Sequence, residues 1–410
     1  MTSEVKERIE QIRHGNAPEG YKKTAACIIP NDWQCSAIRD CLKIKNNERQ
    51  PISEEVRRNI PGPYPYYGPT QAQGYIDSYV SEGPAVLIGE DGDHFLKFKT
   101  KPMTLFVDGQ YTVNNHAHMV VGTEQCTTKW FFYAYQHKSL LNAITRQGAG
   151  RYKLTKEALE RLVVQYPCLE EQNRIIDIIS RQDSVIELKE KLLEEKQRQK
   201  KYLMQQLLTG KKRLPGFDGE WKKVKLKKLL KERKTYSPKG AEYPHVTLST
   251  EGIYAKSERY DRDHLVKNDD KEYKITHRGD ICYNPANLKF GVICMNNFGD
   301  AIFSPIYVTF KVVGKVCPEF LAAYLMRWDF INAVRKYEEG TVYERMAVKP
   351  EDFLKFEMML PPYEEQVAIA EILIVADREI ELLRQDLEQE KRKKTALMQL
   401  LLTGIVRVNV

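Results

Sequence analysis

The sequence PCLEEQNRIIDIISRQDSVIEL at residues 167–188 returns as PPYEEQVAIAEILIVADREIEL at residues 361–382. The two copies then end in YLMQQLLTG at residues 202–210 and ALMQLLLTG at residues 396–404. They align without a gap at a constant offset of 194 residues. A period close to half of the 410 residues predicts a protein of two similar halves.

Each copy predicts one long helix. A Pro at the start, Glu in the first turn and Gly at the end are helix entry and exit signals, and no Pro or Gly interrupts either interior. Steps of four and three residues give six of ten apolar positions in the first copy and eight of ten in the second, which is typical of a coiled-coil seam. The seam positions are Ile175, Ile179, Gln182, Ile186, Lys189, Leu193, Lys196, Lys200, Leu203 and Leu207, and Ile369, Leu373, Ala376, Ile380, Leu383, Leu387, Glu390, Lys394, Leu397 and Leu401.

The two helices are expected to pair with each other. About forty residues at 1.5 Å each give a rod of roughly 60 Å, and neither rod can bury its apolar stripe alone. We expect an antiparallel pair, with the two halves related by a pseudo-twofold axis. The charged seam positions leave open whether the pair separates there or meets a partner; they are Lys196, Lys200, Glu390 and Lys394.

Composition places the chain among folded, reduced, basic proteins. Aromatic residues make up 10% of the chain, which argues against disorder. The eight cysteines contain no CxxC pair and no zinc spacing, so reduced thiols are expected and no metal site is predicted. The charged N-terminus does not resemble a signal peptide, and no apolar run is long enough to span a membrane, so the expected location is the cytoplasm. A net charge of +8 permits nucleic acid as a partner without requiring it.

The predicted fold is α+β, with two mixed α/β globular domains separated by the two long helices in a tandem repeat. The expected boundaries are 1–28 for an N-terminal helical segment, 29–166 for the first globular domain, 167–212 for the first long helix, 213–360 for the second globular domain, and 361–410 for the second long helix and tail. Short apolar runs between turn residues predict strands at 85–88, 94–98, 104–107, 118–121, 245–248, 280–283, 291–295, 301–303 and 307–312. Helices are predicted at 127–135 and 318–336.

The repeated P-x-x-E-E-Q start and L-L-T-G end, alternating with two α/β domains, resemble the specificity subunit of type I restriction-modification systems. The resemblance covers essentially the whole chain. It implies that each globular domain is a target recognition domain that reads one half of a split site in double-stranded DNA. It also implies that the paired helices set the spacer between the half-sites and dock two methyltransferase subunits, which restriction subunits carrying the motor and nuclease then join. The specificity subunit of that family is non-catalytic and binds no cofactor, because S-adenosylmethionine belongs to the methyltransferase subunit.

Candidate DNA contacts follow from side-chain chemistry. Basic side chains suit phosphate contacts, whereas amides, hydroxyls and phenols can bond or stack against base edges. Every candidate is equally compatible with an ordinary surface or turn role. The phosphate candidates are Lys97, Lys99, Lys101, Arg151, Lys153, Lys256, Arg259, Lys289 and Arg345, and the base-edge candidates are Tyr66, Tyr67, Gln71, Gln73, Asn114, Asn115, Thr247, Asn284, Asn287 and Tyr343.

Three other interpretations, as a methyltransferase, a nuclease or a metal-binding protein, have less support in the sequence. Residues 283–287, YNPAN, resemble the N-P-P-aromatic loop of amino-methyltransferases, but Asn287 stands where the stacking aromatic is needed, and no Gly-rich cofactor turn is present. The aspartates within 261–270 look like a solvated loop rather than a nuclease cluster. His116 and His118 are expected on one strand face but have no evident third ligand, so a structural or base-contacting role is favoured over a metal site. The alternative function is a coiled-coil scaffold for proteins, which would not explain two diverged basic domains and would not bind DNA with steep salt dependence.

Overall fold

The computed structural model describes residues 2–147, 151–238, 242–256, 272–337 and 347–408. The chain divides into two compact units. Unit 1 comprises Met1–Lys189 with Asp386–Val410, and unit 2 comprises Glu190–Gln385. Each long helix therefore contributes one part to each unit. Within the described residues, no helix is long and apolar enough to cross a membrane.

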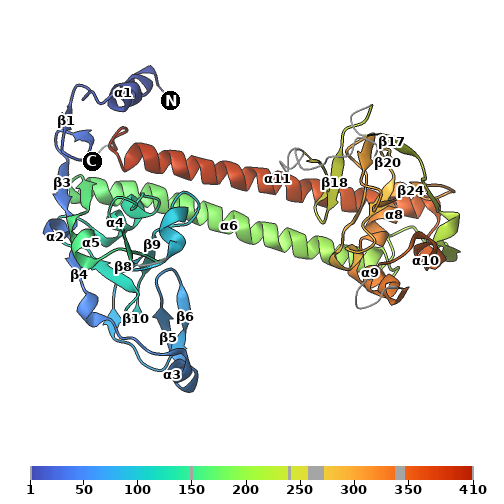
Figure 1. The fold of residues 1–410 in the computed structure, drawn as a ribbon, viewed down its shortest axis with the longest axis horizontal. Helices are drawn as coiled ribbons and strands as arrows, with labels where there is room; N and C mark the ends of the chain where they lie inside the picture. Colours follow the sequence, from blue (N-terminus) through green and yellow to red (C-terminus); the bar gives the residue numbers. More distant parts are fainter. Residues whose placement is uncertain (1, 148–150, 239–241, 257–271, 338–346, 409–410) are drawn as a thin grey trace. The chain divides into compact units, whose positions relative to one another are not determined.

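The two predicted long helices are confirmed as α6 (Leu169–Leu207) and α11 (Tyr363–Leu401). The start of α6 and the end of α11 lie side by side in unit 1 (Figure 1). The pairing is antiparallel in both units, because the partner number on α11 falls as the number on α6 rises. All twenty predicted seam positions are buried or half-buried. The ion pairs between the helices are Asp183–Lys394, Lys189–Glu390 and Lys189–Asp386 in unit 1, and Lys196–Glu379 and Lys200–Asp377 in unit 2.

Unit 1 is built on two four-stranded sheets. One has the order β4 (Lys43–Ile44), β11 (Ala117–Val121), β8 (Ala85–Gly89), β9 (Thr104–Val107), with all neighbours antiparallel. The other has the order β6 (Ala72–Ile76), β5 (Pro61–Tyr67), β10 (Gln110–Val113), β7 (Ser81–Glu82). Helix α4 (Thr128–Tyr135) packs between the first sheet and α6, with Trp130, Phe131 and Tyr135 fully buried (Figure 1). Shorter elements complete the unit: α1 (Ser3–Arg13), β1 (Tyr21–Lys23), β2 (Ile28–Pro30), β3 (Gln34–Ala37), α2 (Ile38–Cys41), α3 (Glu54–Asn59), β12 (Thr145–Gln147), β13 (Arg151–Lys153), α5 (Lys156–Arg161) and β14 (Val163–Tyr166).

Unit 2 repeats the plan with different strands. Its four-stranded sheet has the order β16 (Leu230–Glu232), β24 (Val308–Val312), β21 (Ile281–Tyr283), β22 (Ile293–Met295). A three-stranded sheet has the order β17 (Tyr236–Pro238), β20 (Glu272–Thr276), β23 (Ala301–Phe303), and β18 (Val246–Ser249) forms a hairpin with β19 (Gly252–Ala255). The strand just before each long helix pairs with one near the start of its unit: β14 with β3, and β25 (Glu357–Leu360) with β15 (Lys222–Lys225). The helices are α8 (Pro318–Leu325), α9 (Trp328–Val334) and α10 (Pro350–Lys355).

Two predicted elements were wrong. The strand expected at 94–98 is a 3-10 helix, η2 (Asp93–Lys97), which buries only Phe95 after a left-handed Gly92 and so has no strand-like alternation. The helix expected at 318–336 breaks between α8 and α9, where Arg327 is extended. The Arg327 guanidinium donates to the Leu208 carbonyl, 3.1 Å away, at the end of α6. This bond satisfies a carbonyl that has no partner within its own helix, as is usual at a helix C-terminus. The extended Arg327 that makes the bond separates α8 from α9.

The Gln of the repeated E-E-Q sequence joins each long helix to its unit. Gln172 is fully buried, and its side-chain oxygen accepts from the backbone N–H of Thr127, the residue that caps α4, at 2.9 Å. Gln366 accepts in the same way from the N–H of Cys317, which caps α8, at 2.8 Å. Each Gln amide also donates to the Pro carbonyl five residues earlier. The repeated Gln therefore fixes an equivalent helix in each unit.

The second Glu of E-E-Q accepts hydrogen bonds in a buried site that closes each unit. Glu171 accepts from Trp33 Nε1 at 3.3 Å and from the Arg407 guanidinium at 2.7 Å. In unit 2, Glu365 accepts from Trp221 Nε1 at 3.1 Å and from Arg213 at 2.6 and 2.7 Å. Each arginine follows the Gly of L-L-T-G by three residues, after that glycine has turned the chain in the left-handed region. The start of one long helix and the end of the other thus meet at one carboxylate.

Candidate nucleic-acid interface

A polar cleft of about 360 Å³ in unit 1 brings four predicted base-edge residues together. Tyr66 comes from β5, Gln73 from β6, and Asn114 and Asn115 from the turn between β10 and β11. Two further lining residues, Arg57 and His116, were not among the predicted DNA contacts. Arg57 had no sequence signal of its own, because it lies on a short helix, α3 (Glu54–Asn59), whereas His116 was interpreted as a structural or base-contacting histidine. The full lining is Pro51, Ile52, Ser53, Arg57, Tyr66, Gln73, Asn114, Asn115 and His116.

Two of the four predicted residues form the floor of the cleft. Tyr66 is 1% exposed, and its hydroxyl accepts from the Ile52 N–H at 2.9 Å and donates to the Gln50 carbonyl at 3.1 Å. Asn114 is 5% exposed; its amide donates to Gln73 Oε1 at 3.2 Å, and its oxygen accepts from the His116 N–H at 2.8 Å. Both side chains therefore hold loops in place. Gln73 and Asn115 are exposed, which leaves polar groups at the cleft surface.

The cleft carries positive charge at its wall. The Arg57 guanidinium lies 4.7 Å from the centroid of the Tyr66 ring, a cation–π contact that holds it over the floor. Outside the lining, Arg49 pairs with Glu90 at 2.8 Å and Lys153 approaches the same carboxylate at 3.5 Å. The arrangement offers several donors beside ordered acceptors, which is the chemistry that base edges and phosphates require.

The two histidines do not act as a pair. His116 lies just before β11, and its Nδ1 is 3.0 Å from Asp91 Oδ2. His118 is 1% exposed; its Nε2 donates to the Leu154 carbonyl at 2.8 Å, and its Nδ1 accepts from the Asn46 amide at 2.9 Å. Burial lowers the pKa of His118, so the imidazole is neutral and structural. In the part of the chain that the structure describes, no three His, Cys, Asp or Glu residues are grouped to hold a metal ion.

The remaining candidates of unit 1 lie on the surface. Lys97, Lys99 and Lys101 are exposed at the end of η2 and in the turn that follows it. Arg151 is exposed on β13, which packs against η2, so these four cations share one region. Gln71 is exposed, whereas Tyr67 is half-buried against Tyr111. Burial raises the pKa of the Tyr67 phenol, so this side chain can stack or donate but stays uncharged.

In unit 2, fewer of the predicted DNA-contact residues lie close together. Asn284 is 7% exposed, and its side-chain oxygen accepts from the Ala286 and Asn287 N–H groups, so it closes a turn. Asn287 is exposed in that turn, and Lys289 lies 5.3 Å from the ring of Phe290, an exposed aromatic that sequence reasoning did not name. Thr247 Oγ1 is 3.3 Å from the Tyr307 hydroxyl, and Lys256 is half-buried. Arg259, Tyr343 and Arg345 lie outside the described residues, as do the aspartates within 261–270.

The chain is similar to known proteins along nearly its whole length. The model of the type I restriction modification DNA specificity domain matches twice, at residues 30–197 and 218–391. The putative type I restriction enzyme MjaX specificity subunit of Methanocaldococcus jannaschii is 25% identical over 95% of this chain and 97% of its own. The MjaVIII specificity subunit of the same organism is 24% identical over 95% of this chain and 96% of its own.

The fold is shared with solved structures. The type I restriction-modification system S subunit from M. genitalium aligns with a TM-score of 0.59 over 92% of this chain and 96% of its own, at 11% sequence identity. At that identity the likeness concerns the fold alone. The fold likeness and the two family matches agree on the tandem organisation described above.

Proposed function

We propose that each unit of this chain reads one half of a split site in double-stranded DNA. The proposal starts from the family match, which shows that the chain belongs to the type I restriction modification DNA specificity family. The carrying observation is the polar cleft of unit 1, where Gln73, Asn115 and Arg57 surround a floor fixed by buried hydrogen bonds. Fixed polar groups discriminate bases better than mobile ones, because their geometry is set before binding. The two units share a scaffold but differ in these surface residues, which supports the reading of two different half-sites.

Phosphate contacts are assigned to the exposed cations of η2, the turn that follows it and β13. Lys97, Lys99, Lys101 and Arg151 are exposed and lie on neighbouring elements. Such contacts position a protein on the duplex without reading its sequence, and they make affinity fall steeply with salt. In unit 2 the equivalent assignment rests on Lys289, with Asn287 beside it as a base-edge candidate.

The long helices are assigned two roles, spacing the half-sites and docking partner subunits. Leu188 and Leu382 occupy equivalent positions in the two copies and are 65% and 55% exposed. Large apolar side chains that are exposed to solvent at equivalent positions on both helices support two equivalent binding sites for partner subunits. We assign these to two methyltransferase subunits, which bind S-adenosylmethionine and carry out methyl transfer, and which restriction subunits join. The chain itself then acts without catalysis, in the cytoplasm, where its DNA is.

The deciding experiment is single-molecule methylation mapping of DNA from cells that carry this chain with its cognate methyltransferase subunit. A split adenine-methylated motif is expected only when the chain is present. If an active methyltransferase gives no new motif, the scaffold alternative gains and the proposed function fails. Expression of the methyltransferase alone is the control.

The independence of the two units is tested at their cations. Arg151→Ala is expected to weaken recognition of the half-site read by unit 1 and leave the other half-site unchanged. Arg345→Ala is expected to do the reverse. Arg392→Ala, on an exposed face of α11, is the control for a lost surface charge. Equal losses at both half-sites in either single variant would contradict independent reading.

A further inference from the structure

An equivalent ion pair joins the two long helices in each unit, but its surroundings differ between the units. Asp183 and Lys394 of unit 1 are 2.6 Å apart, and the equivalent pair in unit 2, shifted by 194 residues, is Asp377 and Lys200. In unit 1 the pair is covered from α4. The Tyr133 hydroxyl donates to Asp183 Oδ2 at 2.8 Å, and the Lys394 ammonium lies 5.8 Å from the Tyr133 ring centroid.

Helix α8 of unit 2 occupies the place of α4 but lacks the covering side chains. The capping residues Thr127 and Cys317 bind the equivalent glutamines, which fixes the register between the two helices. Counting on from these caps, Ala323 falls on the position of Tyr133. Met326 likewise falls on Gln136, whose side-chain oxygen accepts from Lys394 at 3.2 Å in unit 1. A phenol and an amide are therefore missing from unit 2.

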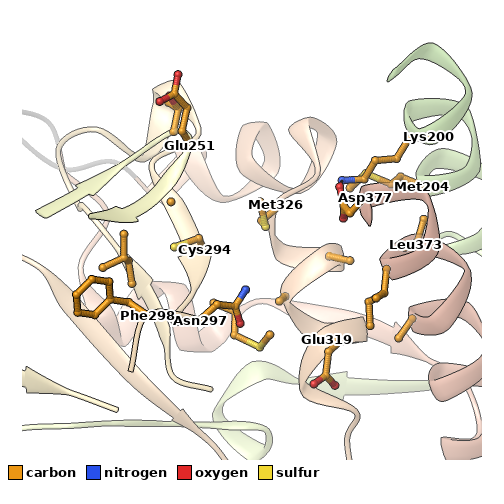
Figure 2. A pocket seen from close by; sticks show the side chains of 18 of the residues that line it. Lys200, Met204, Glu251, Cys294, Asn297, Phe298, Glu319, Met326, Leu373 and Asp377 are labelled. Carbon is orange, nitrogen blue, oxygen red and sulfur yellow. The ribbon is translucent and has the colours of Figure 1, made fainter. Parts of the chain in front are cut away.

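A pocket of about 440 Å³ lies where those groups would be (Figure 2). Lys200, Met204 and Asp377 gather on the long-helix side, and Met326 lines the pocket just after the end of α8 (Figure 2). Ala323 also lines the pocket, which places the missing phenol inside it. The Asp377 carboxylate is 59% exposed, whereas Asp183, covered by Tyr133, is 36% exposed.

We propose that this pocket receives the phenol ring of a tyrosine from a partner protein, with the hydroxyl donating to Asp377. Unit 1 supplies the template, because its own Tyr133 makes that bond to the equivalent carboxylate. The apolar walls and the thioethers of Met204 and Met326 suit an aromatic ring. An anionic ligand is disfavoured, because Asp377 and Glu319 both line the pocket. Tyrosines seated in preformed pockets are frequent anchors of protein interfaces.

A protein fits the mouth of the pocket better than a free small molecule does. Ile374, Met326 and Phe298 all line the pocket and remain 49%, 42% and 43% exposed. These side chains form an apolar rim that a bound ring alone would leave in water, whereas a protein surface around a tyrosine would cover it. The identity of that protein as a methyltransferase subunit rests on the proposed function.

The pocket chemistry is tested on the full chain with ¹³C-methyl methionine, using p-cresol as the tyrosine probe and toluene as the ring without a hydroxyl. Saturable shifts are expected at the Met204 and Met326 methyls, with p-cresol binding about tenfold more tightly, because a hydrogen bond to a charged acceptor contributes roughly 1.5 kcal/mol or more. Ala323→Tyr should abolish binding by filling the pocket, and Ala323→Leu serves if that variant does not fold. Tyr133→Ala should create a second site in unit 1. Absence of saturable p-cresol shifts, or equal binding to the Ala323 variants, would overturn the proposal.

The partner is tested with the cognate methyltransferase subunit. Its affinity for the Ala323→Tyr chain is expected to fall at least about tenfold relative to the natural chain, while Tyr133→Phe, which keeps unit 1 filled, should not change it. A methylated motif from the natural chain together with unchanged subunit affinity for Ala323→Tyr would overturn the tyrosine assignment and leave the proposed function standing. Absence of any motif from the natural chain would instead count against the proposed function.

Discussion

At the scale of single residues, the E-E-Q sequence contains one solvent-facing and two fully buried side chains. Glu364 is exposed, whereas Glu365 and Gln366 are 0% and 1% exposed. The Glu365 carboxylate accepts from Arg213 and the indole of Trp221, and Glu171 accepts from the equivalent residues of unit 1, Arg407 and Trp33. A buried charge is tolerated only when paired and hydrogen-bonded, so the motif depends on an arginine more than 150 residues away.

Glu365→Gln should destabilise unit 2, because it leaves the Arg213 guanidinium without its anion in a partly buried site. Hydrogen exchange followed by mass spectrometry should report faster exchange in unit 2, with unit 1 unchanged. Glu364→Gln makes the same chemical change one residue earlier and should have no such effect. Equal protection in both variants would show that the buried pair contributes nothing.

At the scale of elements, the charged seam positions hold the long helices together. Lys196 and Lys200 pair with Glu379 and Asp377 in unit 2, and Lys394 pairs with Asp183 in unit 1. Glu390 accepts from Lys189 at 2.8 Å and from the Gln182 amide at 2.7 Å. The charged seam positions are therefore paired across the two helices. They also fix the antiparallel register, because a shift of one turn would misplace every partner.

The Glu390 contacts predict an acid-sensitive helix pair. Hydrogen bonds from Lys189 and Gln182 lower the pKa of Glu390 from 4.5 to about 2. A carboxyl group whose pKa is depressed on folding contributes stability above its unfolded pKa and loses it as pH falls toward the folded value. The helix pair in unit 1 should therefore weaken between about pH 4.5 and pH 2.

Acid unfolding measured by circular dichroism tests this prediction. Glu390→Gln should flatten the pH dependence in the range from pH 4.5 to 2, because the variant has no carboxyl group to protonate at that position. Glu388→Gln, on an exposed face of the same helix, is the matched control and should unfold like the natural chain. Identical acid curves for the two variants would remove Glu390 as the cause.

At the scale of the whole molecule, each unit is closed by the start of one long helix and the end of the other. Unit 1 also brings the two ends of the chain together. The Tyr21 hydroxyl donates to the Gly404 carbonyl at 2.7 Å, and Arg407 pairs with Asp32 at 2.7 Å. In unit 2 the equivalent connection is the continuous segment that carries Gly210 and Arg213. The closure that two distant parts of the chain make in unit 1 is therefore made by one continuous segment in unit 2.

Inserting seven residues into both long helices should change the spacer preferred by the assembled complex and leave both half-sites intact. Seven residues add about 10 Å of helix, or roughly three base pairs of duplex at 3.4 Å each. The insertions belong between Lys189 and Lys196 on α6 and between Glu379 and Asp386 on α11, which keeps the flanking ion pairs in register. Methylation mapping would report the new spacer. An unchanged spacer would contradict the proposal that the long helices set the distance between the half-sites.

Four of the predicted base-edge candidates line the cleft, and the roles of its residues depend on tertiary contacts. Gln73, Asn114 and Asn115 were selected for their amides, and the structure brings them into one cleft. Their roles within it differ, because Asn114 is consumed by two internal hydrogen bonds while Asn115 stays exposed. No local pattern distinguishes these two neighbours, since burial is set by strands distant in the sequence. Arg57 was missed for the same reason.

The sequence by itself determined the long helices and the twofold repeat. These features follow from local signals, namely the capping residues, the apolar periodicity and the constant offset of 194 residues. Only the tertiary structure decided where η2 replaces a strand, where Arg327 divides a helix, and why Ala323 leaves a pocket where Tyr133 fills one. The physical reason is that each of these outcomes depends on a partner far along the chain, which periodicity within one segment cannot identify.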